Sequence, residues 1–289
     1  MSKSRNVIDI SKSIYRKLIP SFIRTFFYNK RVPSAVSPVT WTLQNKNWTE
    51  VLKSCQGYDN AKILDKVKSA ALKVKNGGAL FERDSVLFYE PEYNDELIKV
   101  FDLIAENSHG HLHLIDFGGS LGSVYFQYWA KLSKYKNVKW NVIEQPHFVE
   151  FGKKELSSDE LMFYYSFQES ILEHDINAIF LSSVISYMEE PYKLLSEIMA
   201  LNLEFIVIDK TLLTAFSADL LCKQVVKEPI YEASYPCWLL SKEKLIKFIT
   251  VNYDLVNEFN PYSFKQFITT EKKEAVFSGL VFRIRTNNN

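Results

Sequence analysis

An aspartate followed by a glycine-rich turn is the strongest chemical signal in this 289-residue sequence. An apolar run ends at Asp116, and Gly118, Gly119, Ser120 and Gly122 follow it, before a segment that predicts a helix. Glycines let the backbone approach a nucleotide-like ligand closely, and the first turn of a helix offers N–H groups without helical partners. An acid beside the turn would repel the pyrophosphate of a dinucleotide but attract a cationic amino group. The turn therefore predicts a ligand that joins a nucleoside to a cationic amino-acid end.

A second acid lies where such a ligand would place its ribose. Residues 138–143 predict a strand that ends at Glu144, 28 positions after Asp116, and Gln145 follows. In doubly wound folds, the acid that closes the second strand accepts hydrogen bonds from ribose hydroxyls. Together the two acids and the glycine turn predict a site for S-adenosylmethionine. The alternative is a tight strand-to-helix turn with an unrelated surface glutamate.

Three more predicted strands end in residues that we expect at the same edge of the sheet. Their positions suggest adenine contacts after the third strand, contacts with the methyl donor after the fourth, and catalytic roles after the fifth. Serines at strand ends also cap helices, so each set has an ordinary structural alternative. The residues are Phe167 and Gln168, then Ser182 and Ser183, then Asp209 and Lys210.

Methyl transfer to a hydroxyl requires a base near the acceptor. The sequence offers several candidates and does not choose among them. The candidate catalytic residues are His147, Tyr187, Glu189, Asp209 and Lys210, with the Glu82 and Asp84 pair as a further source of a base. The candidate acceptor-binding residues are Glu82, Arg83, Asp84, Tyr235 and Trp238. An arginine that bridges two acids to hold the N-terminal region together is the alternative reading of Arg83.

The elements that must position these residues alternate between strands and helices. Strands are predicted at 112–117, 138–143, 161–165, 176–182 and 203–209, with a final antiparallel pair at 253–259 and 276–284. Helices are predicted at 48–55, 61–74, 95–106, 121–133, 147–156, 187–200 and 241–250. Residues 36–48 read as irregular. We expect three parts, namely an arm over 1–35, a helical cap over 36–108 and a Rossmann-like domain over 109–289, whose insertion at 212–240 shapes the acceptor pocket.

Charge is distributed unevenly along the chain. Residues 1–32 hold eight of the 35 Lys and Arg residues and one acid, Asp9, so the remainder is mildly acidic. A nucleic-acid enzyme would show basic charge across its folded body, and we therefore expect no nucleic-acid partner. The arm is basic and amphipathic, with Pro20 interrupting the pattern. The alternatives are packing on the body or on a second subunit in a homodimer, contact with an anionic membrane surface, and a flexible, inert arm.

Cysteine and histidine content limits the compartment and the cofactors. Cys55, Cys222 and Cys237 are odd in number and lack metal-site spacing, which indicates a reducing, cytoplasmic location. The alternating histidines over 109–113 adjoin no carboxylate cluster. We expect no metal site.

At these residues the chain resembles class I S-adenosylmethionine-dependent methyltransferases. More narrowly, it is similar to a family of methyltransferases associated with bacterial surface-polysaccharide genes. The resemblance covers residues 40–285 and rests on Gly57-Tyr58-Asp59, Glu82 to Phe88, Asp116 to Gly122, Glu144-Gln145-Pro146, Ile208 to Thr211 and Ser234-Tyr235-Pro236. It departs at Ser120, which replaces the middle glycine of the broad pattern, and at Lys210, where the narrower family has arginine.

The resemblance implies an α/β fold with a Rossmann-like seven-stranded sheet, a closing antiparallel hairpin and an N-terminal helical cap. It also implies S-adenosylmethionine as the methyl donor and S-adenosylhomocysteine as the product. The expected function is O-methylation of a sugar in a surface glycan or in its nucleotide- or lipid-linked precursor, with the arm at the inner face of the membrane. The alternatives are methylation of a small metabolite or a protein side chain, and an inactive scaffold in glycan assembly.

Overall fold

The computed structural model describes residues 39–55, 61–227, 233–261, 265–268 and 273–286, all within one compact unit over residues 38–289. The predicted arm over 1–35 lies outside the described residues. Among the helices in these ranges, none combines the length and hydrophobicity that a bilayer span requires.

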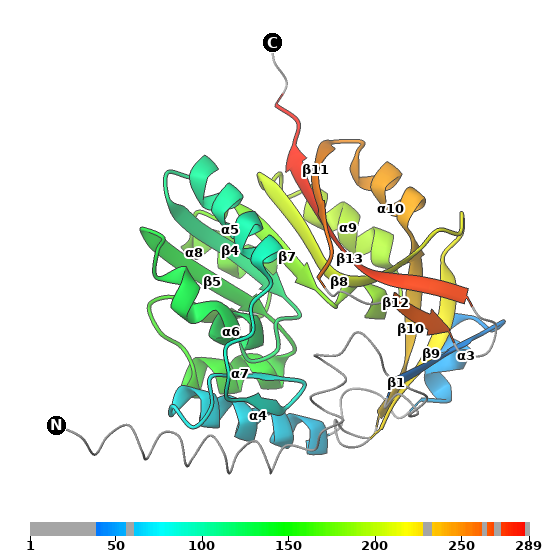
Figure 1. The fold of residues 1–289 in the computed structure, drawn as a ribbon, viewed down its shortest axis with the longest axis horizontal. Helices are drawn as coiled ribbons and strands as arrows, with labels where there is room; N and C mark the ends of the chain where they lie inside the picture. Colours follow the sequence, from blue (N-terminus) through cyan, green and yellow to red (C-terminus); the bar gives the residue numbers. More distant parts are fainter. Residues whose placement is uncertain (1–38, 56–60, 228–232, 262–264, 269–272, 287–289) are drawn as a thin grey trace. The chain divides into compact units, whose positions relative to one another are not determined.

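A mixed sheet forms the centre of this unit (Figure 1). Five parallel strands lie in the order β6 (Leu161–Tyr164), β5 (Asn137–Ile143), β4 (His111–Phe117), β7 (Ala178–Ser182) and β8 (Phe205–Thr214). Antiparallel β13 (Lys273–Ile284) pairs with β8, and β11 (Tyr253–Phe259) pairs with β13. The predicted α/β class, with a mostly parallel sheet and a closing antiparallel pair, is confirmed.

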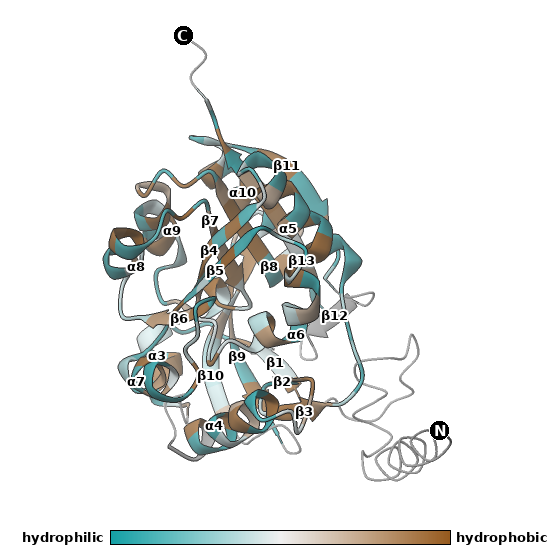
Figure 2. Cartoon of the chain, turned by 90° about the vertical axis from the view of Figure 1, so that its left-hand side faces the viewer, coloured by the Kyte–Doolittle hydropathy of each residue, from teal (hydrophilic) through white to brown (hydrophobic). Residues whose placement is uncertain are grey.

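Helices cover both faces of the parallel strands, which is why these strands are apolar on both sides. Figure 2 shows α5 (Asp95–Asn107) and α6 (Ser123–Leu132) on one side of the brown central strands and α8 (Phe167–Glu173) and α9 (Pro191–Met199) on the other. The remaining helices that follow the parallel strands are α7 (Pro146–Glu155) and α10 (Lys242–Ile249), and a short 3-10 turn, η1 (Ile185–Tyr187), precedes α9.

Buried aromatic rings hold α5 and α6 against the sheet. Phe101 of α5 makes edge-to-face contacts with Tyr128 of α6, Trp140 of β5 and Phe180 of β7, at centroid distances of 5.7, 5.7 and 6.0 Å. All four side chains are at most 1% exposed. This packing fixes the start of α6 relative to β4, and therefore fixes the glycine turn between them.

The N-terminal region differs from the prediction. Residues 36–48 were expected to be irregular, which is wrong for the described part, because β1 (Val39–Leu43) is a strand of the main sheet. It pairs with β9 (Leu220–Val226), which pairs with β10 (Ala233–Ser241). β10 then meets the end of β8 at Leu240 and Leu213. The segment predicted as an insertion at 212–240 thus extends the sheet. Its strand β9 pairs with β1, which lies about 180 residues earlier in the sequence.

The other elements of the region 39–108 are helical or form a small hairpin. Helices α3 (Trp48–Lys53) and α4 (Ala61–Lys75) precede a hairpin of β2 (Phe81–Arg83) and β3 (Val86–Phe88). Near the other end of the chain, β12 (Lys265–Ile268) pairs with β13.

Candidate functional site

The carboxyl ends of four neighbouring parallel strands bring the predicted polar residues to one edge of the sheet. Asp116 lies near the end of β4, Glu144 follows β5, Ser182 ends β7, and Asp209 pairs with Ser182 in the register of β7 and β8. Ligands of open α/β sheets bind at this edge, where the strand order reverses. The strand order here reverses at β4, next to Asp116.

Asp116 and the glycine turn are packed against each other. Asp116 is 1% exposed, and its Oδ2 accepts a hydrogen bond of 2.8 Å from the indole nitrogen of Trp140. A Cβ on Gly119 would overlap the Asp116 carboxylate, so only glycine fits there. Gly122 has a φ of 84° and directly precedes α6, with no side chain capping the helix. The first N–H groups of α6 are therefore directed at the turn.

The pKa of Asp116 is raised to about 7, mainly because its burial penalises the charged form. The indole hydrogen bond of Trp140 lowers this pKa, the negative charge of Glu144 raises it, and the positive charge of Lys210 lowers it. A positively charged ligand group beside Asp116 would favour its ionised form in the same way. The site is thus suited to a cation.

Glu144 connects the second strand to the glycine turn. Its carboxylate accepts hydrogen bonds from the backbone N–H groups of Gln145, at 2.7 Å, and of Ser120. Burial raises the pKa of Glu144, while these two bonds and the nearby His147 lower it. Ser120 has a φ of 54°, a left-handed conformation that favours glycine. The departure from the glycine pattern is therefore accommodated without losing the contact between the turn and Glu144.

Two aromatic rings lie beside this pair of acids. Phe117, between Asp116 and the glycine turn, stacks on Phe167 at 5.4 Å with an angle of 30° between the rings. Phe167 begins α8, a helix that the sequence reading missed, and Ser166 caps it by accepting from the N–H of Glu169. Gln168 is exposed at the same helix start. The stacked rings provide the flat apolar surface on which a nucleobase can pack.

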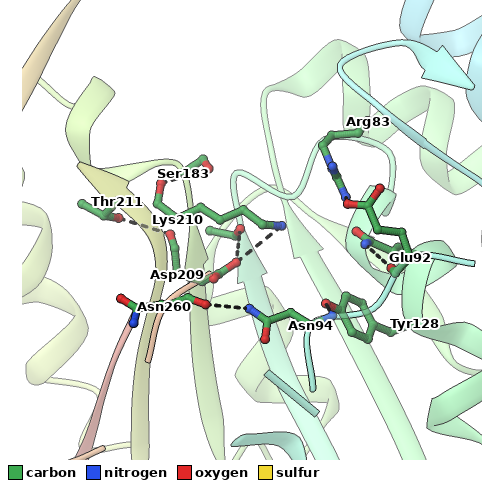
Figure 3. A network of polar contacts seen from close by, with 11 residues as sticks. Arg83, Glu92, Asn94, Tyr128, Ser183, Asp209, Lys210, Thr211 and Asn260 are labelled. Atoms are coloured by element: carbon green, nitrogen blue, oxygen red, sulfur yellow. Dashed lines mark hydrogen bonds and ion pairs between the residues drawn. The ribbon is translucent and has the colours of Figure 1, made fainter. Parts of the chain in front are cut away.

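The ends of β7 and β8 form a hydrogen-bonded cluster of charged residues (Figure 3). The hydroxyl of Ser182 donates to Oδ2 of Asp209 at 2.8 Å, and the ammonium of Lys210 lies 3.6 Å from the same oxygen. Asp209 is completely buried, and its Oδ1 has no hydrogen-bond partner. Ser183 is exposed, and its hydroxyl donates to the carbonyl of Lys210.

A β-bulge explains how Lys210 reaches this cluster. The pairing of β8 with β13 shifts between Ile208 and Thr211, and Lys210 within the shift has a φ of 47°. Bulges place one extra residue in a strand and redirect its side chain, frequently beside active sites. Lys210 extends from β8 toward the region of Asp116 and Asp84, whose pKa values its charge lowers.

The predicted acid–base–acid cluster forms the tip of the β2–β3 hairpin. Glu82 is 3% exposed and accepts hydrogen bonds from the hydroxyl of Ser123 in α6 and from the N–H of Ser85. Its pKa is raised to about 7, chiefly by burial. Asp84 and Ser85 occupy the turn with φ values of 50° and 64°. The hairpin is therefore anchored at the start of α6.

Arg83 and Asp84 point to different surroundings. Arg83 pairs with Glu92 at 2.9 Å and lies over the rings of Phe81 and Phe88. Asp84 is exposed, and nevertheless its pKa is raised by the protein atoms around it and lowered by Arg83 and Lys210. Asp84 is therefore an exposed carboxylate that is influenced by the charges of Arg83 and Lys210.

Tyr187 and Tyr235 belong to an aromatic and amide cluster. Their rings meet edge to face at 5.2 Å. The buried amide of Gln224 accepts hydrogen bonds of 3.0 Å from the hydroxyl of Tyr187 and from the indole of Trp41, and donates to the hydroxyl of Tyr235 at 3.4 Å. Burial raises the pKa of Tyr187 well above its usual value. This tyrosine therefore stays protonated at neutral pH and acts as a hydrogen-bond donor.

Several of the predicted site residues lie together at the carboxyl ends of the parallel strands, and others lie elsewhere. Asp116, Glu144, Ser182, Asp209 and Lys210 meet at the strand ends, whereas Glu189 and Trp238 line a pocket formed by other residues, described below. The sequence reading missed Trp140, Gln224 and Trp41, because nothing local marks them as partners of the site. Across the described ranges, no group of three or more His, Cys, Asp and Glu side chains could hold a metal ion.

Comparison with known proteins gives remote structural likenesses. No protein-family model matches the chain, and no curated protein matches it. Among solved structures, the N-terminal domain of EvdMO1, determined with SAH and D-fucose, has a TM-score of 0.43 at 14% identity, covering 80% of this chain and 100% of that chain. CalS10 of Micromonospora echinaspora, an amino pentose methyltransferase with bound SAM, has a TM-score of 0.40 at 11% identity, covering 67% and 92%.

A third likeness is to magnesium protoporphyrin IX methyltransferase of Synechocystis PCC 6803 with bound SAH, at a TM-score of 0.41 and 10% identity, covering 66% of this chain and 81% of that chain. These values are low.

Proposed function

We propose that the chain is an S-adenosylmethionine-dependent methyltransferase that methylates a sugar hydroxyl in a surface glycan or in its nucleotide- or lipid-linked precursor. One observation carries the donor assignment. Two acids, Asp116 and Glu144, flank a glycine turn that leaves no room for a side chain at Gly119, and burial raises the pKa of both acids. A cationic nucleoside ligand would relieve this destabilisation.

The residues present fit the two ends of the donor. In this proposal Asp116 and the free N–H groups of α6 hold the amino-acid end, Glu144 accepts hydrogen bonds from the ribose, and Phe117 with Phe167 contacts the adenine. When bound, the donor supplies an electrophilic methyl group. The chain's own contribution is alignment of donor and acceptor, which is worth about 7–11 kcal/mol in favourable cases.

Asp84 is the carboxylate best placed to take the proton from the acceptor hydroxyl. It is exposed, and desolvation raises its pKa above the ordinary value of an aspartate, which makes it a stronger base. Asp209 is less suitable, since it is completely buried and already bonded to Ser182 and Lys210. Lys210 would orient Asp84, and Tyr187 with Tyr235 would offer hydroxyl groups to a polyhydroxylated acceptor. For the arm over 1–35, we retain the proposal of contact with the inner face of the membrane.

Calorimetric titration of S-adenosylhomocysteine tests the donor assignment. We expect micromolar binding to the wild type, and a loss of about 10- to 100-fold in both Asp116→Ala and Glu144→Ala, because each removes a charged partner. Affinity should rise with pH through about 7, since only ionised Asp116 attracts the ammonium group and its pKa is about 7. NAD and nucleotide sugars serve as control ligands. If the wild type binds none of the S-adenosyl compounds, the methyltransferase proposal fails and the scaffold alternative gains support.

Replacement of Asp84 tests the proposed base. We expect Asp84→Asn to lower the rate of methyl transfer to nucleotide-linked hexoses by about 10²- to 10⁴-fold while leaving S-adenosylhomocysteine binding unchanged. In the wild type the rate should increase with pH through the raised pKa of Asp84, because the base must be ionised. Ser85→Gly is the matched control, because it changes the same turn but keeps the Asp84 carboxylate. It also keeps the backbone N–H of residue 85, which donates a hydrogen bond to Glu82. Equal rates in Asp84→Asn and Ser85→Gly would show that another group is the base.

A further inference from the structure

A pocket lined by none of the residues of the proposed donor site lies beside the extension of the sheet by β9 and β10. Its volume is about 840 Å³, within the range of small-molecule sites. The segment from Leu43 to Lys53 forms one side, and residues 219–221, Glu189 and Trp238 form the other. Asp116, Glu144, Asp209 and Lys210 do not line it. Ligand binding in this pocket is therefore independent of the proposed methyl transfer.

Two tryptophans, together with Leu43, Leu220 and Leu221, form the apolar part of this pocket. Trp48 begins α3 and Trp238 lies on β10, and their rings stack at 5.8 Å with an angle of 20°. Both are partly exposed. The indole of Trp238 donates to the carbonyl of Glu189 at 3.3 Å, and a capping box between Asn47 and Glu50 fixes the start of α3. The two rings are therefore held in place before any ligand arrives.

The polar lining is rich in amides and nearly balanced in charge. Gln44, Asn45 and Asn47 contribute amides, and the charged side chains are Lys46, Lys53, Glu50, Glu189 and Asp219. Asp219 is neutralised by Lys244 at 2.5 Å and also accepts from the hydroxyl of Tyr192. Two lysines then face two remaining carboxylates. A phosphate, a nucleic acid or an acidic sugar would find no excess of positive charge here.

We infer that this pocket binds a neutral saccharide. The face of an aromatic ring carries partial negative charge and packs against the C–H groups of a sugar ring. Amides and carboxylates pair with its hydroxyl groups as donors and acceptors. A proline-rich peptide is the competing ligand, since it also binds aromatic grooves. The amides and charged side chains of the lining disfavour it, because proline has no backbone N–H or side-chain donor to pair with them.

Saturation-transfer NMR without any methyl donor tests the inference. The probes are D-glucose, D-galactose, L-rhamnose and N-acetyl-D-glucosamine, with glucuronic acid and a decaproline peptide as competing classes. We expect transfer to the ring protons of at least one neutral sugar, and an affinity at least about tenfold lower in Trp48→Ala. Trp129→Ala is the matched control, because Trp129 is 61% exposed on α6, outside the pocket.

A second variant keeps the test informative if Trp48→Ala is unstable. Glu189→Gln alters one exposed lining residue without removing a ring, and we expect it to weaken sugar binding while thermal melting stays unchanged. Binding that persists in both variants, absence of binding by every neutral sugar, or binding of decaproline alone would each overturn the inference. A sugar signal in a protein that fails to bind S-adenosylhomocysteine would support this pocket and contradict only the proposed methyltransferase function.

Discussion

Replacing Asp116 by asparagine is expected to stabilise the unliganded protein at pH 8 and to abolish binding of S-adenosylhomocysteine. In the folded protein the pKa of Asp116 is about 7, against 3.8 for an unperturbed aspartate. Ionising it at pH 8 therefore costs stability, and asparagine removes this cost while still accepting from the Trp140 indole. The expected gain is about 2–4 kcal/mol, from a difference of about three pKa units.

The sign of the pH dependence follows from proton uptake. Between about pH 4 and pH 7 the folded wild type keeps a proton on Asp116 that the unfolded chain has lost, so its stability falls as pH rises. Urea unfolding at pH 4 and pH 8 should show nearly equal stability of the two proteins at pH 4 and a more stable variant at pH 8. Asp159→Asn, at an exposed position, is the control and should change neither value. A variant less stable than wild type at pH 8 would show that the carboxylate is favourably paired without ligand.

Replacing Lys210 by methionine is expected to lower the free energy of unfolding by about 3–5 kcal/mol and to abolish methyl transfer. The ammonium of Lys210 lies 3.6 Å from the carboxylate of the completely buried Asp209, and the Lys210 side chain is itself only 11% exposed. Its charge also lowers the pKa of Asp84 and Asp116. Without it, Asp209 becomes a buried charge whose remaining partner is the Ser182 hydroxyl.

A double-mutant cycle with Asp209→Asn separates this electrostatic effect from loss of packing. Asparagine needs no counter-charge, so the Asp209→Asn/Lys210→Met protein should recover most of the stability that Lys210→Met loses. The coupling measured by urea unfolding should be about 1–3 kcal/mol. Strictly additive effects would mean that the two side chains do not interact, and that Lys210 acts through its hydrocarbon stem alone. Lys210→Arg, which keeps the charge, is the conservative control.

Local sequence patterns predicted the framework of the donor site. The strands that end at Asp116 and Glu144 were predicted to within a residue or two, because each is an apolar run followed by a turn or a helix start. The glycine turn was recognisable for the same reason, since backbone conformations with positive φ select glycine wherever they occur. The closing pair of β11 and β13 was also predicted from residues close in the chain.

The sequence by itself determined the α/β class, the order of the elements and the acids that follow the parallel strands, because periodicity and turn chemistry act over a few residues. Only the tertiary structure decided which side chains contact those acids. The indole of Trp140 bonds Asp116, the bulge aims Lys210 at Asp209, and β1 joins β9 at the far end of the chain. It also stacks Trp48 on Trp238 and places Glu189 in the lining of their pocket. The Trp140–Asp116 and Trp48–Trp238 contacts join residues 24 and 190 positions apart, and the direction of Lys210 depends on the pairing of β8 with β13. These contacts depend on which strands pair and which faces pack, which no local pattern encodes.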